Sequence, residues 1–225
     1  MQVTGSNKTQ VSIQVKSDGF AINSGCARSE WLGADRVFTT PELQKRFDEV
    51  AISVFTPKFT LIPTNFFRPE DARAMLGETF TLAPEEGVGY AQLPQFGAVA
   101  VFSTSVNGTL ARMLHESVRK TDGSKGLLIP EQYFMLTSLE KISEYNKIVA
   151  SYADGYIHLI VAQGKTLLLC NSFEASDFTT AEYFIFMVLR KFQLNPEVST
   201  IYFRTPLSAE EEESLYSYFH SVETF

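Results

Sequence analysis

The chain has 225 residues, of which 44% are hydrophobic, and its 26 acidic and 19 basic side chains give a formal charge of −7. That apolar content can form a substantial core, so disorder is not expected, and the length suits one large domain or two small ones. The negative average charge repels phosphate backbones and anionic lipid headgroups, and therefore argues against nucleic acid as a partner.

The first element expected in the chain is a β-hairpin. Val11, Ile13 and Val15 alternate with polar residues, which is the period of a strand with one buried face. Asp18 and Gly19 then supply a turn before a second strand, FAIN. The pattern predicts two antiparallel strands joined near the Asp-Gly pair.

Helices and strands alternate through the rest of the first half. Thr40 precedes Pro41, an arrangement typical of a helix start, so we expect a helix through LQKRFDE at 43–49. The acidic residues after Pro69 begin a second helix, and a third is expected at 108–119. The expected strands are AISVF, FTLIP and AVAVF, whereas GVGYAQ is interpreted as loop.

The polar run TDGSKG at 121–126 is the expected linker between two halves, because it has no apolar side chain with which to pack. The second half opens with a helix starting at Pro130. Strands IVASYAD, YIHLIVA and KTLLLC follow as a meander, with Asp154 and Gly155 in the turn between the first two.

Two helices and a strand complete the second half. Thr179 and Glu182 have the spacing of a capping box ahead of EYFIFMVLRKF, an apolar helix that we expect to be largely buried. Strand STIYF follows, and Ser208 with Glu211 has the spacing of another capping box. The four glutamates after Ala209 are then the solvated first turn of a last helix.

Cysteine content and the chain start indicate a cytoplasmic protein without membrane insertion. Cys26 and Cys170 are too few for a disulfide framework or a four-thiolate zinc site, and we expect both to be buried as small apolar residues. The start, MQVTGSNKTQVSI, lacks the apolar stretch of a secretory signal. The longest apolar run elsewhere, at 183–189, falls far short of the roughly 20 residues of a spanning helix.

Three landmarks recur in the same order in the two halves. They are an Asp-Gly strand turn (18–19 and 154–155), FTT before a helix (38–40 and 178–180), and Thr-Pro after a strand (56–57 and 205–206). Each short match alone carries little weight, but three in one order predict a duplicated unit of hairpin, strand, helix and strand.

A unit of three meandering strands followed by alternating helices and strands resembles the ribonuclease-H-like halves of the actin, hexokinase and heat-shock chaperone superfamily. Within it, the chain is most similar to an uncharacterised family of Bacteroidetes proteins with a degenerate actin-like fold. The segments that carry the resemblance are FTPKFTLIPTNFF, IHLIVAQGKTLLLCNSF, and the following helix and strand through STIYF.

The resemblance implies an α/β protein of two ribonuclease-H-like halves related by internal duplication, the actin-like ATPase fold. We expect the first subdomain at 1–125 and the second, shorter one at 126–225. The second half is expected to be truncated, because only one strand-helix unit follows STIYF. The glycine pair that packs on the adenine base in actin-like enzymes is missing from that part of the chain.

The resemblance also points to two hairpin turns that hold nucleotide phosphates in actin-like ATPases. Asp18 with Gly19 and Asp154 with Gly155 occupy the corresponding turns and are the candidate ligand-binding residues, for ATP with Mg²⁺. The family's turns carry an acidic residue, several glycines and a hydroxyl residue, whereas each turn here has one glycine. Bulky Phe20 and Tyr156 are expected to crowd the phosphate path. Asp-Gly is also a preferred hairpin turn in its own right, and we favour that interpretation.

Other chemistries lack their sequence patterns. His115, His158 and His220 do not have the spacing of a metal-binding pair, and His158 is expected to be a neutral, hydrogen-bonded, half-buried imidazole. No GxSxG elbow, Walker loop or GxGxxG motif follows a strand. Cys170 has no histidine placed to activate it, and Trp31 is either a surface anchor or a buried ring.

These observations leave three hypotheses about function. The favoured one is a non-catalytic protein that needs no cofactor and uses an actin-like scaffold to bind a protein partner or a second copy. The second is a nucleotide-binding protein or slow ATPase that uses Asp18 and Asp154 around Mg²⁺ between the halves. The third is an enzyme of unknown chemistry with its site in the cleft between the halves.

Overall fold

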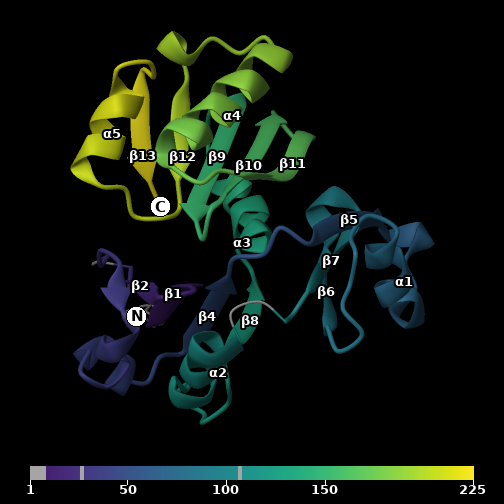
Figure 1. The fold of residues 1–225 in the computed structure, drawn as a ribbon, viewed down its shortest axis with the longest axis vertical. Helices are drawn as coiled ribbons and strands as arrows, with labels where there is room; N and C mark the ends of the chain where they lie inside the picture. The colour runs from purple at the N-terminus through teal and green to yellow at the C-terminus, as the bar shows by residue number, and fades with distance from the viewer. Residues whose placement is uncertain (1–8, 26–27, 106–107) are drawn as a thin grey trace, which may run out of the picture. The chain divides into compact units, whose positions relative to one another are not determined.

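The computed structural model describes residues 9–25, 28–105 and 108–225, and the chain forms two units (Figure 1). The first unit is Met1–Val54 with Asn107–Ile129, and the second is Phe55–Val106 with Pro130–Phe225. These units do not coincide with the expected subdomains 1–125 and 126–225, because the excursion from Phe55 to Val106 belongs to the second unit.

A five-stranded sheet in the order β3-β2-β1-β4-β8 forms the first unit. Its strands are β1 Gln10–Lys16, β2 Gly19–Asn23, β3 Leu32–Gly33, β4 Glu49–Val54 and β8 Leu127–Pro130. Strand β1 pairs antiparallel with β2 and parallel with β4, as the expected hairpin and strand require. Val11, Ile13 and Val15 are buried, so the alternating pattern of this strand is confirmed.

Helix α2, Gly108–Ser117, covers this sheet with Leu110 and Leu114 in the core. The helix expected at 43–49 is wrong: only 3-10 turns form, at Ala34–Phe38 and Pro41–Gln44. The Thr40 hydroxyl donates to the Arg36 carbonyl and caps nothing, and Lys45 is extended. The chain must straighten there because residues 49–54 form β4 beside β1.

The run TDGSKG is not a linker in the structure. Its amides and carbonyls close a turn in which Lys120 N–H donates to the Ser124 carbonyl at 3.0 Å. The Thr121 hydroxyl donates to the Asp48 carboxylate at 3.1 Å, which ties the turn to the strand before β4. Gly126 packs so closely that a Cβ there would lie 2.5 Å from the Val50 carbonyl oxygen. The side chains of this run bond to their own unit, and the chain passes into the second unit at Ile129 and Pro130, four residues beyond the expected boundary.

A second five-stranded sheet, in the order β11-β10-β9-β12-β13, lies in the second unit. Its strands are β9 Asn146–Ala153, β10 Tyr156–Gln163, β11 Thr166–Glu174, β12 Thr200–Phe203 and β13 Ser221–Thr224. The meander and the strand after the long helix are confirmed, and β12 is parallel to β9. Strand β13 was not expected, and with it this sheet has as many strands as the first, so the sheet is not truncated.

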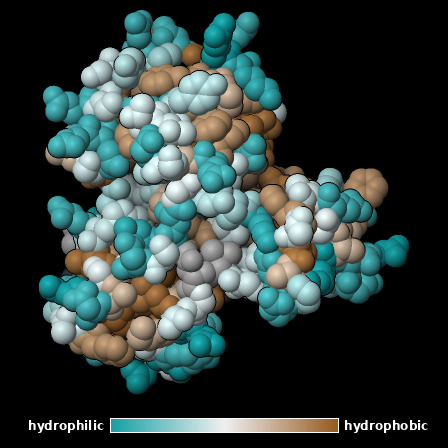
Figure 2. Space-filling model, viewed as in Figure 1, coloured by the Kyte–Doolittle hydropathy of each residue, from teal (hydrophilic) through white to brown (hydrophobic). Residues whose placement is uncertain are grey.

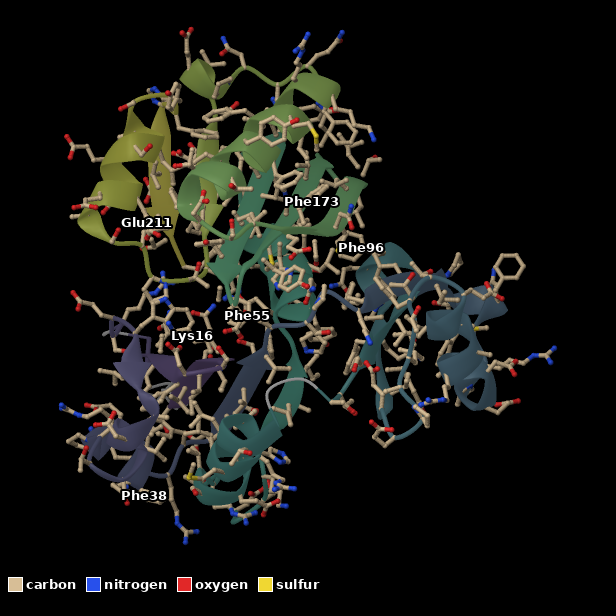
Figure 3. All side chains as sticks on the ribbon, viewed as in Figure 1. Lys16, Phe38, Phe55, Phe96, Phe173 and Glu211 are labelled. Carbon is tan, nitrogen blue, oxygen red and sulfur yellow. The ribbon has the colours of Figure 1, made fainter. Side chains whose placement is uncertain are left out.

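Three helices accompany this sheet: α3 Glu131–Ser138, α4 Phe178–Lys191 and α5 Ala209–Tyr216. The cap of α4 is Asp177, whose carboxylate accepts from Thr180 N–H, so the capping box expected at Thr179 is wrong. Nor is α4 largely buried, because Tyr183 is 63% exposed on its outer face. The capping box of α5 at Ser208 and Glu211 is confirmed; Glu211 is labelled in Figure 3. None of the helices in the described part of the chain has the length and apolar character needed to span a bilayer.

The two sheets share one strand order: third, second, first, fourth, fifth. In both, the first three strands form an antiparallel meander and the fourth is parallel to the first. The helix before the fourth strand differs, because α4 has 14 residues where the first sheet has only 3-10 turns. The shared order fits the expected duplication, which itself remains a prediction.

The excursion in the second unit contains a three-stranded sheet in the order β5-β7-β6 and one short helix. Its elements are β5 Phe59–Pro63, α1 Ala72–Gly77, β6 Val88–Leu93 and β7 Ala98–Ser103. The interpretation of GVGYAQ as loop is wrong, because Val88 to Leu93 pair antiparallel with β7. Gly89, which looks like a loop residue, lies under the Phe102 ring, where a Cβ would be 2.9 Å from the ring.

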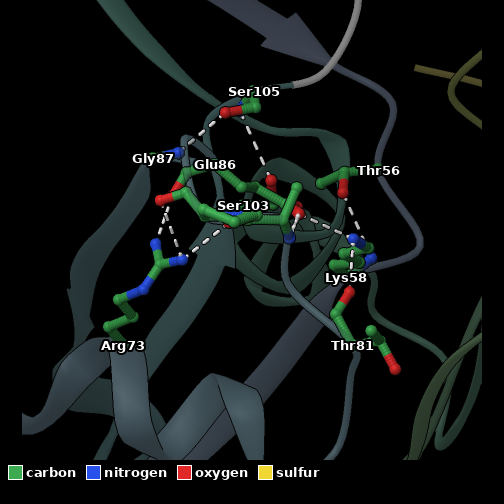
Figure 4. Close-up of polar contacts among 10 residues, drawn as sticks. Thr56, Lys58, Arg73, Thr81, Glu86, Gly87, Ser103 and Ser105 are labelled. Carbon is green, nitrogen blue, oxygen red and sulfur yellow. Dashed lines mark hydrogen bonds and ion pairs between the residues drawn. The ribbon is translucent and has the colours of Figure 1, made fainter.

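A polar network holds the loop before β6 (Figure 4). The Glu86 carboxylate accepts from Lys58 Nζ at 2.8 Å and from Ala83 N–H at 3.0 Å. Arg73, on α1, donates to the carbonyl oxygens of Ala83, Pro84 and Glu86. The Lys58 hydrogen bond is the largest of the contacts that lower the pKa of Glu86 to about 2. The loop is thereby fastened to both β5 and α1.

Candidate functional site

The hairpin turn of the first unit is closed by its own chain. Lys16 pairs with Gly19, so the two turn residues are Ser17 and Asp18, and Gly19 already belongs to β2. Asp18 lies on the surface and forms an ion pair with Lys16 Nζ at 3.0 Å. A Cβ at Gly19 would lie 2.5 Å from the Leu32 carbonyl oxygen, so this glycine is required by the approach of β3.

The hairpin turn of the second unit uses its Asp-Gly pair differently. Ala153 pairs with Tyr156, so Asp154 and Gly155 are themselves the turn residues. Both have positive φ, 53° and 73°, which is the backbone of a type I′ turn. Asp and Gly are favoured there because they tolerate this conformation, so turn chemistry alone accounts for the pair.

The two turns are therefore offset by one residue relative to the sequence match. The second turn residue of each hairpin, Asp18 or Gly155, offers its carbonyl to the first residue after the third strand, Ala34 or Ala175. These bonds are 3.2 and 2.7 Å long. Asp18 thus corresponds to Gly155, and Asp154 has Ser17 as its counterpart. The turns do not present a matching pair of aspartates, and they lie in different units.

The expected crowding by an aromatic side chain does not hold for the first turn, and for Tyr156 it stays a prediction. Phe20 is completely buried in the core of the first unit, because its strand position directs the ring away from the turn. Tyr156 is half-buried at the start of β10. The turns depart from the family's pattern through their single glycines and internal hydrogen bonds, and Phe20 plays no part in that.

A polar row crosses the buried face of the second sheet beneath α3. Ser151, His158 and Ser172 occupy directly paired positions on β9, β10 and β11. The Ser172 hydroxyl lies 2.7 Å from His158 Nδ1, and the Gln132 amide on α3 lies 3.2 Å from the same nitrogen. That amide also donates to the Thr56 carbonyl, which joins α3 to the segment before β5.

His158 is more deeply buried than expected, with no exposed surface, and its ring stacks on Phe55. Burial is the main cause that lowers its pKa to about 4. The imidazole is therefore neutral at physiological pH, as expected, and a weak proton acceptor for catalysis. Neither Nε2 of His158 nor Oε1 of Gln132 has a hydrogen-bond partner among the described residues.

A buried ion pair stands beside this row. Glu131, at the start of α3, has no exposed surface and accepts from Arg204 Nε at 2.9 Å and from the Ser151 hydroxyl at 2.8 Å. The guanidinium of Arg204 lies 5.7 Å from the centre of the Phe134 ring. The pair fixes α3 to the ends of β9 and β12, so we interpret it as a structural anchor.

A groove of about 310 Å³, lined by uncharged residues, lies between β5 and β11, both in the second unit. Its lining residues come from those two strands and from the loop that follows α1: Phe59, Thr60, Leu61, Thr79, Phe80 and Leu167, Leu168, Leu169, Cys170, Asn171. Each strand is the edge of its sheet. Apolar atoms are exposed in Figure 2 where the lobe of β5 to β7 adjoins the larger sheet, near Phe173 on β11 in Figure 3.

Cys170 lines this groove and is half-buried, whereas a buried residue was expected. Desolvation raises the thiol pKa to about 12, so the sulfur is a poor nucleophile. Cys26 lies outside the described residues. The Trp31 ring is half-buried and lies 5.1 Å from Lys16 Nζ. Within 9–25, 28–105 and 108–225, no three His, Cys, Asp or Glu side chains gather in a way that could hold a metal ion.

The groove could not be read from the sequence, because its walls come from segments about a hundred residues apart. Part of the polar row could be predicted from the sequence. The two-residue turn at Asp154 and Gly155 sets Ser151 opposite His158, which a register count gives directly. Ser172 is harder to place, because the pairing of β10 with β11 shifts between Val161 and Ala162.

The architecture is that of the actin-like ATPase fold. A protein of Bacteroides thetaiotaomicron, described as having that fold and unknown function, aligns with 100% of this chain and 93% of its own, at 20% identity and a TM-score of 0.63. A type IV pilus biogenesis complex of PilM and PilN aligns with 96% of this chain and 88% of its own, at 10% identity and a TM-score of 0.51.

The sequence gives the family. Residues 34–222 match the family described as protein of unknown function DUF3822, and the chain belongs to that family. No curated protein matches the sequence. The expected resemblance to an uncharacterised family with an actin-like fold is thus confirmed.

Proposed function

We propose that this protein is a non-catalytic member of the actin-like fold that acts by binding another protein. The observation that carries the proposal is the groove between two open sheet edges, each lined with partly exposed apolar side chains. Soluble proteins rarely leave apolar edge strands uncovered, because such edges invite pairing with other chains. A groove without charged residues between two sheet edges is therefore more consistent with a docking surface than with a surface left to solvent.

The geometry of the hairpin turns supports the non-catalytic part of the proposal. Actin-like ATPases need glycine-rich turns so that backbone N–H groups can approach a phosphate. Here Gly19 is held against β3, and the Asp154 and Gly155 turn is tied to the end of β11. The acidic groups of the two turns do not correspond to each other, since Asp18 matches Gly155.

The comparison with the pilus complex supports partner binding by analogy. The matching structure is described as a complex of PilM with PilN, so an actin-like scaffold of similar topology takes part there in a protein complex. At 10% identity the likeness extends to the fold alone, and the partner of this chain must be argued from its own surface.

The proposal is tested by purification with interacting proteins from the native cell, followed by reconstitution from purified components. A stoichiometric complex that re-forms from the two pure proteins is the expected result. In parallel, calorimetric titration with ATP and Mg²⁺ should give no binding heat. ATP hydrolysis that is lost in Asp154→Ala but kept in Asp177→Ala would refute the proposal in favour of an ATPase.

A further inference from the structure

We infer that the outer face of α4 and α5 binds a second copy of this chain, in a two-fold dimer whose two α4 helices run antiparallel. This inference goes beyond the proposed function, because it concerns another surface of the second unit and another partner. Three observations lead to it: the two helices are parallel to each other, their outer face is apolar in the middle, and the two ends of that face carry opposite charges.

Helices α4 and α5 lie side by side and run in the same direction (Figure 1). The Ser214 hydroxyl donates to the Glu182 carboxylate at 2.7 Å. Four residues further along the chain in each case, the centre of the Phe186 ring lies 4.9 Å from that of the Tyr218 ring. Because the contacts advance together on both segments, the N-terminal ends of α4 and α5 lie at one end of the outer face and their C-terminal ends at the other.

The middle of the outer face is apolar, whereas a surface helix usually presents polar side chains to solvent. Tyr183 and Met187 lie one turn apart on α4 and are both exposed, as is Tyr218 next to Phe186. Ten large apolar side chains are exposed in the described part of the chain, and five of them lie between residues 183 and 218. Figure 2 shows apolar side chains at the surface in the upper part of the molecule, where Figure 1 places α4. Such a concentration of exposed apolar groups is typical of an association surface.

The two ends of the outer face carry charges of opposite sign. Arg190 and Lys191 lie in the last turn of α4, and both are exposed. Glu210 lies in the first turn of α5 and Glu182 in the first half of α4, which places both toward the other end. Arg190 and Lys191 form no ion pair with any residue that the structure describes. A partner that neutralises them must bring carboxylates to the C-terminal end of α4.

A second copy brings these carboxylates when the two α4 helices run antiparallel. Tyr183 and Met187 are equally distant from the level of Ile185, so a two-fold axis through that level sets each Tyr183 opposite Met187 of the second copy. Arg190 lies five residues beyond Ile185, about 7.5 Å along the helix. The same distance in the opposite direction ends within one turn of Glu182. The axis therefore brings Arg190 of each copy to the Glu182 end of the other.

The first turn of α5 adds a carboxylate at this end. Ser214 lies beside Glu182, and Glu210 is one turn before Ser214 on the same side of α5. Glu182 and Glu210 therefore flank the position that Arg190 of a second copy faces. The contact is reciprocal, because the two-fold axis repeats it at the other end of the face.

Other occupants fit the charges of the outer face less well. A second copy in the parallel orientation would place the glutamates of one copy against those of the other. A partner with only basic side chains would meet Arg190 and Lys191 at the far end. The formal charge of −7 repels two copies at long range, but at physiological ionic strength charges more than about 8 Å apart are largely screened. The antiparallel dimer is therefore the occupant that the charges favour.

The experiment measures the mass of the full chain by sedimentation equilibrium over a range of protein concentrations; one copy has 25.2 kDa. Tyr183→Asp changes the centre of the interface, Arg190→Glu changes its end, and Arg190→Glu with Glu210→Arg exchanges two charges. Phe66→Asp and Lys165→Glu are the matched controls, because both residues are exposed in the second unit and lie outside α4 and α5. Circular dichroism checks that each variant is folded.

The dimer predicts a wild-type mass of twice 25.2 kDa. Tyr183→Asp and Arg190→Glu should each raise the dissociation constant at least tenfold, because each change occurs twice in a two-fold interface. Adding Glu210→Arg to Arg190→Glu should lower the dissociation constant again, since the new arginine offers a counter-charge to the new glutamate. Phe66→Asp and Lys165→Glu should dimerise as the wild type does.

A wild-type chain that stays monomeric would overturn the inference, and so would a dimer that Tyr183→Asp and Arg190→Glu leave intact. A dimer that only Phe66→Asp or Lys165→Glu weakens would place the contact on another surface, which overturns the inference equally. If Tyr183→Asp does not fold, Arg190→Glu at an exposed position still decides. None of these outcomes concerns the groove between β5 and β11, so the proposed function is tested separately through its own partner complex.

Discussion

Replacing Arg204 by methionine removes the cation from the buried ion pair and keeps an apolar stem against Phe134. The partner carboxylate of Glu131 has no exposed surface, and the Arg204 side chain is 14% exposed. Removing one member of a buried pair costs about 3–5 kcal/mol, and the partial exposure of Arg204 places the expected loss near 3 kcal/mol. For a chain of this size that lowers the melting temperature by about 6–12 °C.

Urea unfolding followed by circular dichroism measures this loss, with Arg190→Met as the matched control, because Arg190 is exposed on α4. The control should change stability by less than about 0.5 kcal/mol. The double variant Glu131→Gln with Arg204→Met should be more stable than the sum of the two single losses implies, since each single change breaks the same contact. A loss below about 1 kcal/mol in Arg204→Met would refute the reasoning, because exposed ion pairs contribute that little.

Three further predictions concern other buried or crowded groups. Folding lowers the pKa of His158 from 6.5 to about 4. The free energy of unfolding should therefore be highest above pH 6.5 and should decrease by up to about 3 kcal/mol as the pH falls toward 4. Urea titrations of His158→Gln should show a flatter pH profile than those of the wild type. Glu86→Gln should lower the free energy of unfolding by about 1–2 kcal/mol, because its bond to Lys58 is weaker, and should speed amide hydrogen exchange in the loop before β6. In the wild type the contribution of the Glu86 carboxylate to stability is lost as the pH falls from 4.5 toward 2. Gly19→Ala should destabilise by about 1–3 kcal/mol in thermal melts, whereas Gly108→Ala, with open space around it, should not.

Strands were the part of the fold most accessible from the sequence. Val11, Ile13 and Val15 could be assigned because alternation reports burial on one face of a sheet, and the meander of the second half followed from its turns. The helix expected at 43–49 failed because Phe47 packs into the core and the chain must straighten into β4. Local capping signals cannot anticipate that tertiary requirement.

The candidate sites were less accessible, for two different reasons. The hairpin turns were found from their Asp-Gly pairs, but dipeptide composition does not show which residue of the pair is in the turn. The groove depends on the packing of two edge strands that are distant in the chain, and no local pattern records such a neighbour. Half-exposed apolar runs such as LLLC in β11 look like ordinary core strands until the sheet order is known.

The different placement of Gly19 and Gly155 affects any alignment of the first half of the chain with the second. Aligning the two Asp-Gly pairs with each other would shift β2 by one residue relative to β10. Because side chains alternate along a strand, that shift would equate inward positions with outward ones over the whole element. A correct alignment sets Phe20 against Ile157, two core residues, and accepts that the glycines do not match.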